Sequence, residues 1–226
     1  MDPDTFREQV ESAADTELAR LGSNKLLLAV TGADLTTEAV LRTAAAAERA
    51  SRDTFAEWAD AEADPDVRAV FERVADQERK HLERVRAELE AVVGGDVEEA
   101  DGDGDDDVTD DAASDGAVHE SLRERTDTVE RVAAGMIGRG LVSLRTHTQY
   151  VSFFVNEADS TRADLFRELK ADVEADVETG LELLAEHCDE DDWQGAEAAA
   201  VATIDAAYEE YEAALTELGM DPKPVC

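Results

Sequence analysis

Apolar residues recur every three or four positions along most of this 226-residue chain. That spacing is typical of amphipathic helices, and the alternating runs that indicate strands are almost absent. Two helix starts are clear, because Thr36 or Thr37 can cap one helix and Asp64 followed by Pro65 opens another. We therefore expect an all-α protein, with helices over about residues 3–20, 36–62, 64–92, 119–157, 160–188 and 193–218.

The lengths of the connections predict how these helices pair. Only a few residues join the second helix to the third and the fourth to the fifth, so each pair must form an antiparallel hairpin. Between the hairpins lies a long acidic crossover, residues 94–116, whose centre Asp101–Asp107 is too acidic and glycine-rich to fold and predicts a flexible linker. Two hairpins joined by one long crossover form the connectivity of ferritin-like four-helix bundles.

This connectivity predicts three parts of the chain. We expect an N-terminal helix and connector over residues 1–35, the ferritin-like bundle over residues 36–188, and a C-terminal helix and tail over residues 189–226. Two independent hairpins are the alternative, but an isolated hairpin would bury too little apolar surface to be stable. The last helix has a broad apolar side over residues 193–218, which could cap the bundle or form a homodimer interface.

Polar residues interrupt the apolar stripes of the first hairpin at mid-height. Glu48 stands in the middle of the stripe of the second helix, where a carboxylate is costly unless it is paired or bound to a metal. Glu78 and His81 do the same on the third helix, as a Glu-x-x-His motif whose spacing puts both side chains on one face. One Glu from one helix and Glu-x-x-His from the next are half of a di-iron carboxylate site.

The hairpin Ala44–Glu90, with Ala-Ala-Glu48-Arg-Ala and Asp76-Gln-Glu78-Arg-Lys-His81, resembles the first half of a rubrerythrin-family, ferritin-like protein. The resemblance spans roughly residues 36–188 and its motif is firm in the first half. It implies a bundle that holds two iron or manganese ions, which react with peroxide or oxygen. It also implies that Glu48 is the first-helix ligand, Glu78 the bridging ligand and His81 its terminal partner.

The second half of the chain departs from the family's pattern. Placed by internal symmetry, Phe154 pairs with Phe55 and Phe166 with Phe71. His147 then takes the place of Glu48, Val173 that of Glu78 and Asp176 that of His81, so the second Glu-x-x-His is missing.

The predicted site is therefore a single-metal cluster of Glu48, Glu78, His81 and His147, with Asp176 as a marginal fifth member. Two imidazoles and two carboxylates suit iron, manganese or zinc. The alternative is that these are hydrogen-bonded core residues without a metal, and His147, next to Tyr150, could equally be a core histidine. We expect His119 and His187 to be exposed residues rather than ligands.

The net charge limits the classes of binding partner and indicates the cellular environment of the protein. The chain has 57 acidic and 21 basic residues, for a formal net charge of −36. Nucleic acid and anionic membranes are disfavoured, because both require clustered Lys and Arg. Such self-repulsion is tolerable in concentrated salt, where the Debye length falls to roughly 3 Å at 1 M. With only two cysteines and no signal-peptide pattern, we expect a halophilic, cytoplasmic protein.

Two classes of function remain open. The first is a rubrerythrin-like metal-binding protein with peroxide- or oxygen-linked redox activity. Whether it is an enzyme is open; if so, it is an iron- or manganese-dependent oxidoreductase that needs an external electron donor, since the chain has no Cys-rich iron module. The second is a non-catalytic ferritin-like scaffold or regulatory protein that acts through partner binding and holds no metal.

Overall fold

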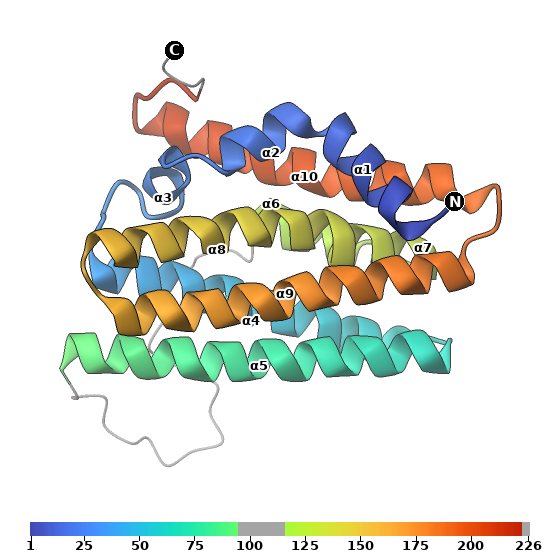
Figure 1. Cartoon of the computed structure of the whole chain (residues 1–226), viewed down its shortest axis with the longest axis horizontal. Helices are drawn as coiled ribbons and strands as arrows, with labels where there is room; N and C mark the ends of the chain where they lie inside the picture. Colours follow the sequence, from blue (N-terminus) through green and yellow to red (C-terminus); the bar gives the residue numbers. More distant parts are fainter. Residues whose placement is uncertain (95–115, 223–226) are drawn as a thin grey trace.

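The computed structural model describes residues 1–94 and 116–222, and every regular element within them is helical (Figure 1). This confirms the all-α prediction. The elements are α1 (Pro3–Ala13), α2 (Asp15–Leu21), α3 (Lys25–Val30), α4 (Thr37–Ala61), α5 (Pro65–Val93), α6 (Gly116–Arg123), α7 (Thr128–Arg131), a π-helical segment η1 (Val132–Gly138), α8 (Arg139–Asn156), α9 (Ser160–His187) and α10 (Asp192–Glu217). The centre of the predicted linker, Asp101–Asp107, and Cys226 lie outside the described residues.

The four long helices α4, α5, α8 and α9 form the bundle, as two antiparallel hairpins that lie side by side (Figure 1). The predicted symmetry is visible in the aromatic core. Phe55 contacts Phe71 in the first hairpin, with ring centroids 5.8 Å apart. Phe154 stacks on Phe166 in the second, with centroids 5.5 Å apart. The two pairs belong to separate apolar clusters, and a layer of polar side chains lies between them.

The ends of the first hairpin follow its sequence signals. Thr36 caps α4 by accepting a hydrogen bond from the backbone N–H of Ala39. The carboxylate of Asp64 accepts from Asp66 and Val67 at the start of α5, where Pro65 takes the first helical position. Gly94 ends α5 in the left-handed conformation with φ 82°, which glycine adopts without steric cost.

Two expected elements differ from the prediction near the N-terminus. The helix expected over residues 3–20 is broken at Ala14, which ends α1 and begins α2 with φ −112° and ψ 28°. The connector expected up to residue 35 contains α3. Its residues Leu26, Leu27 and Ala29 are buried, so packing stabilises a helix too short to be stable alone.

The helix expected over residues 119–157 is also interrupted. The first piece, α6, ends at Arg123, and Asp127 caps a new helix, α7, by accepting from the N–H of Glu130. The chain then passes through the π-helical turn η1 before α8 begins at Arg139. Glycines in this segment allow close packing: a Cβ at Gly135 would lie 2.4 Å from the Trp58 ring.

The last helix, α10, packs on the side of the bundle formed by η1 and α8, beside α1 and α2 (Figure 1). Its apolar side is buried within the chain, at Ala196, Ala200, Ile204, Ala207, Tyr211 and Leu215. The backbone of η1 approaches it closely, since a Cβ at Gly138 would lie 2.5 Å from the carbonyl oxygen of Ala200. The apolar side therefore covers the bundle, and the homodimer through residues 193–218 stays a prediction.

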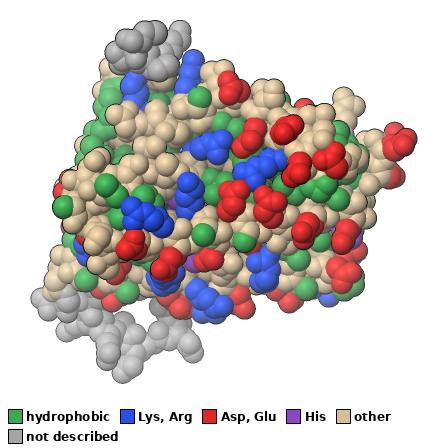
Figure 2. Space-filling model, viewed as in Figure 1, with side chains coloured by type: hydrophobic (Ala, Val, Ile, Leu, Met, Phe, Trp, Pro, Cys, Tyr) green, Lys and Arg blue, Asp and Glu red, His purple; other side chains and the backbone are tan. Residues whose placement is uncertain are grey.

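Acidic side chains spread over the face shown in Figure 2, with Lys and Arg between them. Some of these charges tie elements together. Arg7 on α1 reaches both Glu174 and Glu178 on α9, with N–O distances of 2.8 Å to each. Within the described part of the chain, no helix combines the length and the apolar character that a membrane span requires.

Candidate metal centre

The polar layer of the bundle holds Glu48 on α4 and both Glu78 and His81 on α5. All three are buried, with exposed fractions of 4%, 1% and 2%. One ligand atom from each lies within 4.8 Å of the others. Nδ1 of His81 is 3.5 Å from Oε2 of Glu48 and 3.5 Å from Oε2 of Glu78, too far for good hydrogen bonds. This buried nitrogen has no hydrogen-bond partner.

The other nitrogen of His81 is fixed by an acid on α9. Nε2 lies 3.0 Å from Oδ2 of Asp172, so a proton on Nε2 is donated to that carboxylate. The lone pair then lies on Nδ1, facing Glu48 and Glu78. Histidine ligands in metal sites are held in this way by a second acid. Asp172 thus positions His81.

Asp176, expected as a marginal fifth member of the cluster, contacts Arg73 and Gln77, and Asp172 is the acid that contacts His81. Asp176 is buried, but its carboxylate accepts hydrogen bonds from Arg73 at 2.8 Å and Gln77 at 2.6 Å. Asp172 lies one helical turn earlier on α9, and the sequence analysis missed it. The signal available was that spacing of four residues, which puts both acids on one side of the helix.

His147 on α8 approaches the layer from the second hairpin. Its Nε2 lies 3.4 Å from Oε1 of Glu48, and this buried nitrogen also lacks a hydrogen-bond partner. Its Nδ1 is 2.9 Å from the carbonyl oxygen of Ser143, which can accept only from an N–H. In the neutral imidazole the lone pair is therefore on Nε2, which faces Glu48. His147 lies against Glu48 and is not one of the three residues within 4.8 Å of one another.

A buried arginine compensates Glu78. Nη2 of Arg139 is 3.3 Å from Oε1 of Glu78, and the hydroxyl of Ser51 donates to the same oxygen at 2.9 Å. Arg139 is held in turn by a hydrogen bond from its Nε to the carbonyl of Gly135, 3.1 Å, and by the ring of Phe55 beneath its guanidinium. One oxygen of Glu78 is thus engaged, while the other faces His81.

The ionisation of the layer favours a bound cation. Burial opposes the charged form of Glu48, yet its contacts with His147 and His81 hold the pKa of this carboxyl well below its usual range. Burial and the nearby charge of Glu48 raise the pKa of Glu78. Burial would lower the pKa of His81, but both carboxylates together raise it to about 10. Without a metal, a proton on His81 and the guanidinium of Arg139 together offset the charges of Glu48 and Glu78. A metal ion would replace the proton on His81.

The remaining predicted residues lie elsewhere. His119, expected to be exposed, is half-buried, and its Nδ1 is 2.9 Å from the hydroxyl of Thr54. Packing of α6 against α4 produces this burial. His187 is partly exposed, with Nδ1 4.0 Å from a carboxylate oxygen of Asp64. Neither belongs to the group of Glu48, Glu78 and His81.

These donors are suited to hold a metal ion. Imidazole nitrogens and carboxylate oxygens are suitable ligands for iron, manganese or zinc. In the symmetry that the resemblance implies, Val173 stands where a second ion would find a carboxylate, and Arg139 supplies a positive charge to Glu78. Within the described residues, Glu48, Glu78 and His81 are the group whose ligand atoms converge closely enough to hold an ion.

Comparison with known proteins supports the resemblance of the first hairpin to the rubrerythrin family. A family model described as Rubrerythrin matches residues 25–89, which include Glu48, Glu78 and His81. Searches of the curated proteins and of the solved structures found no match. The matched residues form α3, α4 and most of α5. The first hairpin of this chain is therefore similar to the rubrerythrin family, and the all-α structure is consistent with a ferritin-like helical bundle.

Proposed function

We propose that the protein binds one iron or manganese ion through Glu48, Glu78 and His81, with His147 as a further ligand, and uses it in peroxide- or oxygen-linked redox chemistry. The observation that carries this proposal is the pair of buried imidazole nitrogens, on His81 and His147, that face carboxylates without hydrogen bonds. Buried polar atoms without partners are rare in folded proteins and call for a ligand or ion.

The chain's own residues would hold and orient the ion. Glu48 and Glu78 supply negative charge, and His81 and His147 supply neutral nitrogen lone pairs. Asp172 and the Ser143 carbonyl fix the two imidazole tautomers. A bound iron or manganese ion would supply the one-electron redox chemistry that side chains alone lack. The sequence has two cysteines, so we propose that electrons come from an external donor.

A second candidate function is a non-catalytic ferritin-like scaffold that acts through partner binding. The observation that favours it is the Arg139–Glu78 ion pair, because this pair lowers the need for a cation at the layer. Metal content separates the two candidates.

The test is the metal content of the untagged protein. The protein is purified in molar KCl, and its metals are measured by inductively coupled plasma mass spectrometry. We expect about one ion per chain. The variant Glu78→Ala/His81→Ala should bind none, whereas Glu72→Ala/Glu90→Ala, which removes two exposed acids from the same helix, should bind as the native protein does. Absence of metal after anaerobic reconstitution would leave the scaffold as the function. Loaded protein is then assayed with peroxide and oxygen.

A further inference from the structure

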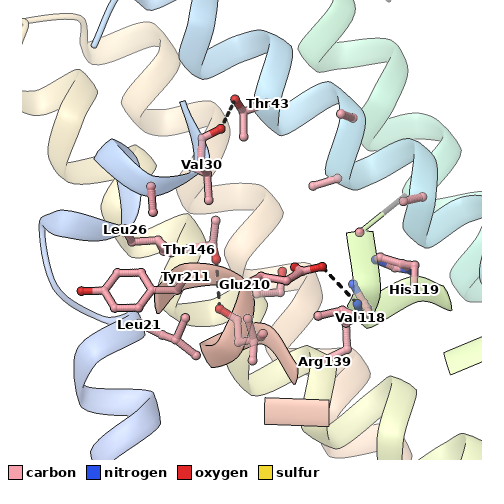
Figure 3. A pocket seen from close by; sticks show the side chains of 18 of the residues that line it. Leu21, Leu26, Val30, Thr43, Val118, His119, Arg139, Thr146, Glu210 and Tyr211 are labelled. Atoms are coloured by element: carbon pink, nitrogen blue, oxygen red, sulfur yellow. Dashed lines mark hydrogen bonds between the residues drawn. The ribbon is translucent and has the colours of Figure 1, made fainter. Parts of the chain in front are cut away.

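A cavity of about 400 Å³ lies between the bundle and the helices that cover it (Figure 3). Its walls come from α2, α3, α4, α6, α8 and α10. Apolar side chains line most of it, among them Leu21, Leu26, Ala29, Val142, Ala207 and Ala214. Binding sites for small molecules have this character, with volumes of roughly 300–1,000 Å³.

One wall of the cavity is the polar layer itself. Glu48, His147 and Arg139 all line it, so the cavity borders the proposed ligands on the α4 and α8 side. His81, Asp172 and Asp176 are not among its lining residues. A molecule in the cavity would therefore meet the centre from the side of Glu48 and His147.

Several polar groups of the lining are already engaged. The Thr146 hydroxyl donates to the Val142 carbonyl at 3.2 Å, within its own helix. Glu210 accepts from the backbone N–H groups of Ala117 and Val118 (Figure 3). Arg139 is paired with Glu78, and Glu48 is in contact with two histidines. Nε2 of His147 has no hydrogen-bond partner, and it is the proposed metal ion that would bind it.

Charge points to an uncharged occupant as well. The lining contains two acids, Glu48 and Glu210, and two arginines, Arg49 and Arg139. These formal charges balance, so the cavity has no net charge that would select an ion. An anion would also be repelled by the net charge of −36.

We propose that this cavity binds a small uncharged, largely apolar molecule beside the metal centre. An apolar cavity of roughly 150 Å³ holds benzene, so 400 Å³ has room for a substituted aromatic ring or a short aliphatic chain. Binding is a property of the cavity alone. That the ligand lies beside a metal rests on the proposed function. If both hold, small uncharged, largely apolar molecules are the class that reaches the metal centre.

The test uses 4-fluorotoluene as the probe and follows its fluorine NMR signal during titration with metal-free protein in molar KCl. We expect saturable binding. Phenylalanine placed in the lining should occupy the space and weaken binding by about tenfold or more, both in Ala46→Phe on α4 and in Ala214→Phe on α10. The matched control is Ala56→Phe, at an exposed position of α4, which should bind the probe as the native protein does.

Two variants on different helices keep the test valid if one fails to fold, which circular dichroism reveals. Absence of saturable binding, or equal binding by the folded lining variants, would overturn the inference. A second arm repeats the titration with Mn²⁺-loaded protein, whose unpaired electrons broaden the signal of a nearby probe. Broadening of the fluorine signal supports a probe position beside the metal. If manganese binds and the signal does not broaden, that position is wrong. Failure to bind either manganese or iron refutes the proposed function and leaves the metal-free result intact.

Discussion

The guanidinium of Arg139 lies 3.3 Å from the carboxylate of Glu78, and both side chains are almost fully buried. The chain thus places a permanent positive charge on the carboxylate that the rubrerythrin resemblance assigns as a bridge between two ions. Glu78 has one oxygen toward Arg139 and Ser51 and the other toward His81. The proposed metal ion would lie on the side of His81.

Removing that charge should destabilise the metal-free protein. In Arg139→Met the side chain keeps most of its bulk, but Glu78 loses its cation, and a buried charge without a partner costs about 3–5 kcal/mol. Urea unfolding in molar KCl measures the loss. Added Mn²⁺ should restore part of it, because a bound cation compensates Glu78. The control is Arg79→Met on the same helix as Glu78, whose ion pairs are exposed and should change stability by less than about 1 kcal/mol.

Asp172 should control metal affinity through His81. Asp172→Asn keeps an oxygen that can accept from Nε2 of His81 but removes the negative charge that strengthens His81 as a ligand. Loss of such an outer acid typically costs 10–100-fold in affinity, and we expect about tenfold in a competition titration with a metal indicator. Glu182→Gln, an exposed change on the same helix, should leave affinity unchanged. Equal affinities would show that Asp172 does not position His81.

The sequence could predict the residues of this centre that lie on a clear helical pattern, but not those that only the packing of distant helices brings to it. Glu48, Glu78 and His81 interrupt clear apolar stripes on two adjacent helices, so helical periodicity alone places them together. Asp172 is half exposed and stands among many acids, and only the packing of α5 against α9 distinguishes it from them. Arg139 was outside the predicted site because no local spacing shows that an arginine turns inward.

Close packing at η1 should make its glycines intolerant of a methyl group. Gly138→Ala puts a Cβ 2.5 Å from a backbone oxygen of α10, which cannot move aside as a side chain could. We expect a loss of about 1–3 kcal/mol in the free energy of unfolding. Gly195→Ala is the contrasting change: nothing lies within 4 Å of that position, and alanine favours a helix by roughly 0.5–1 kcal/mol. Thermal unfolding should move the two variants in opposite directions.

The start of α9 should lose stability in acid. Asp159 accepts from the N–H of Arg162, and this hydrogen bond holds the pKa of its carboxyl below the usual value. Its contribution is present above the unfolded pKa of about 3.9 and is lost as the pH falls through the lower folded value. Asp159→Ala should therefore cost about 1 kcal/mol at pH 7 and progressively less toward pH 2. Unfolding curves at several pH values, with Glu182→Ala as the control for overall charge, measure this difference.

The interrupted helix before α8 shows where periodicity ceases to be informative. Residues 119–157 have helical spacing throughout, yet Asp127 offers a cap, and a new helix begins there. The π segment follows, and apolar residues fill all of its positions that are not glycine. Because every side of η1 is buried, the sequence carries no polar face from which the change of winding could be read.

The π turn η1 determines how the side chains of α8 are rotated about the helix axis relative to those of α7. Each residue of an α-helix turns the chain by about 100°, and a π turn closes over one residue more than an α turn does. Deletion of one residue within Val132–Gly138 would let the helix continue as α and would rotate Arg139 relative to the residues before the turn. A length change of a single codon, without any substitution, would then change which side chain faces Glu78.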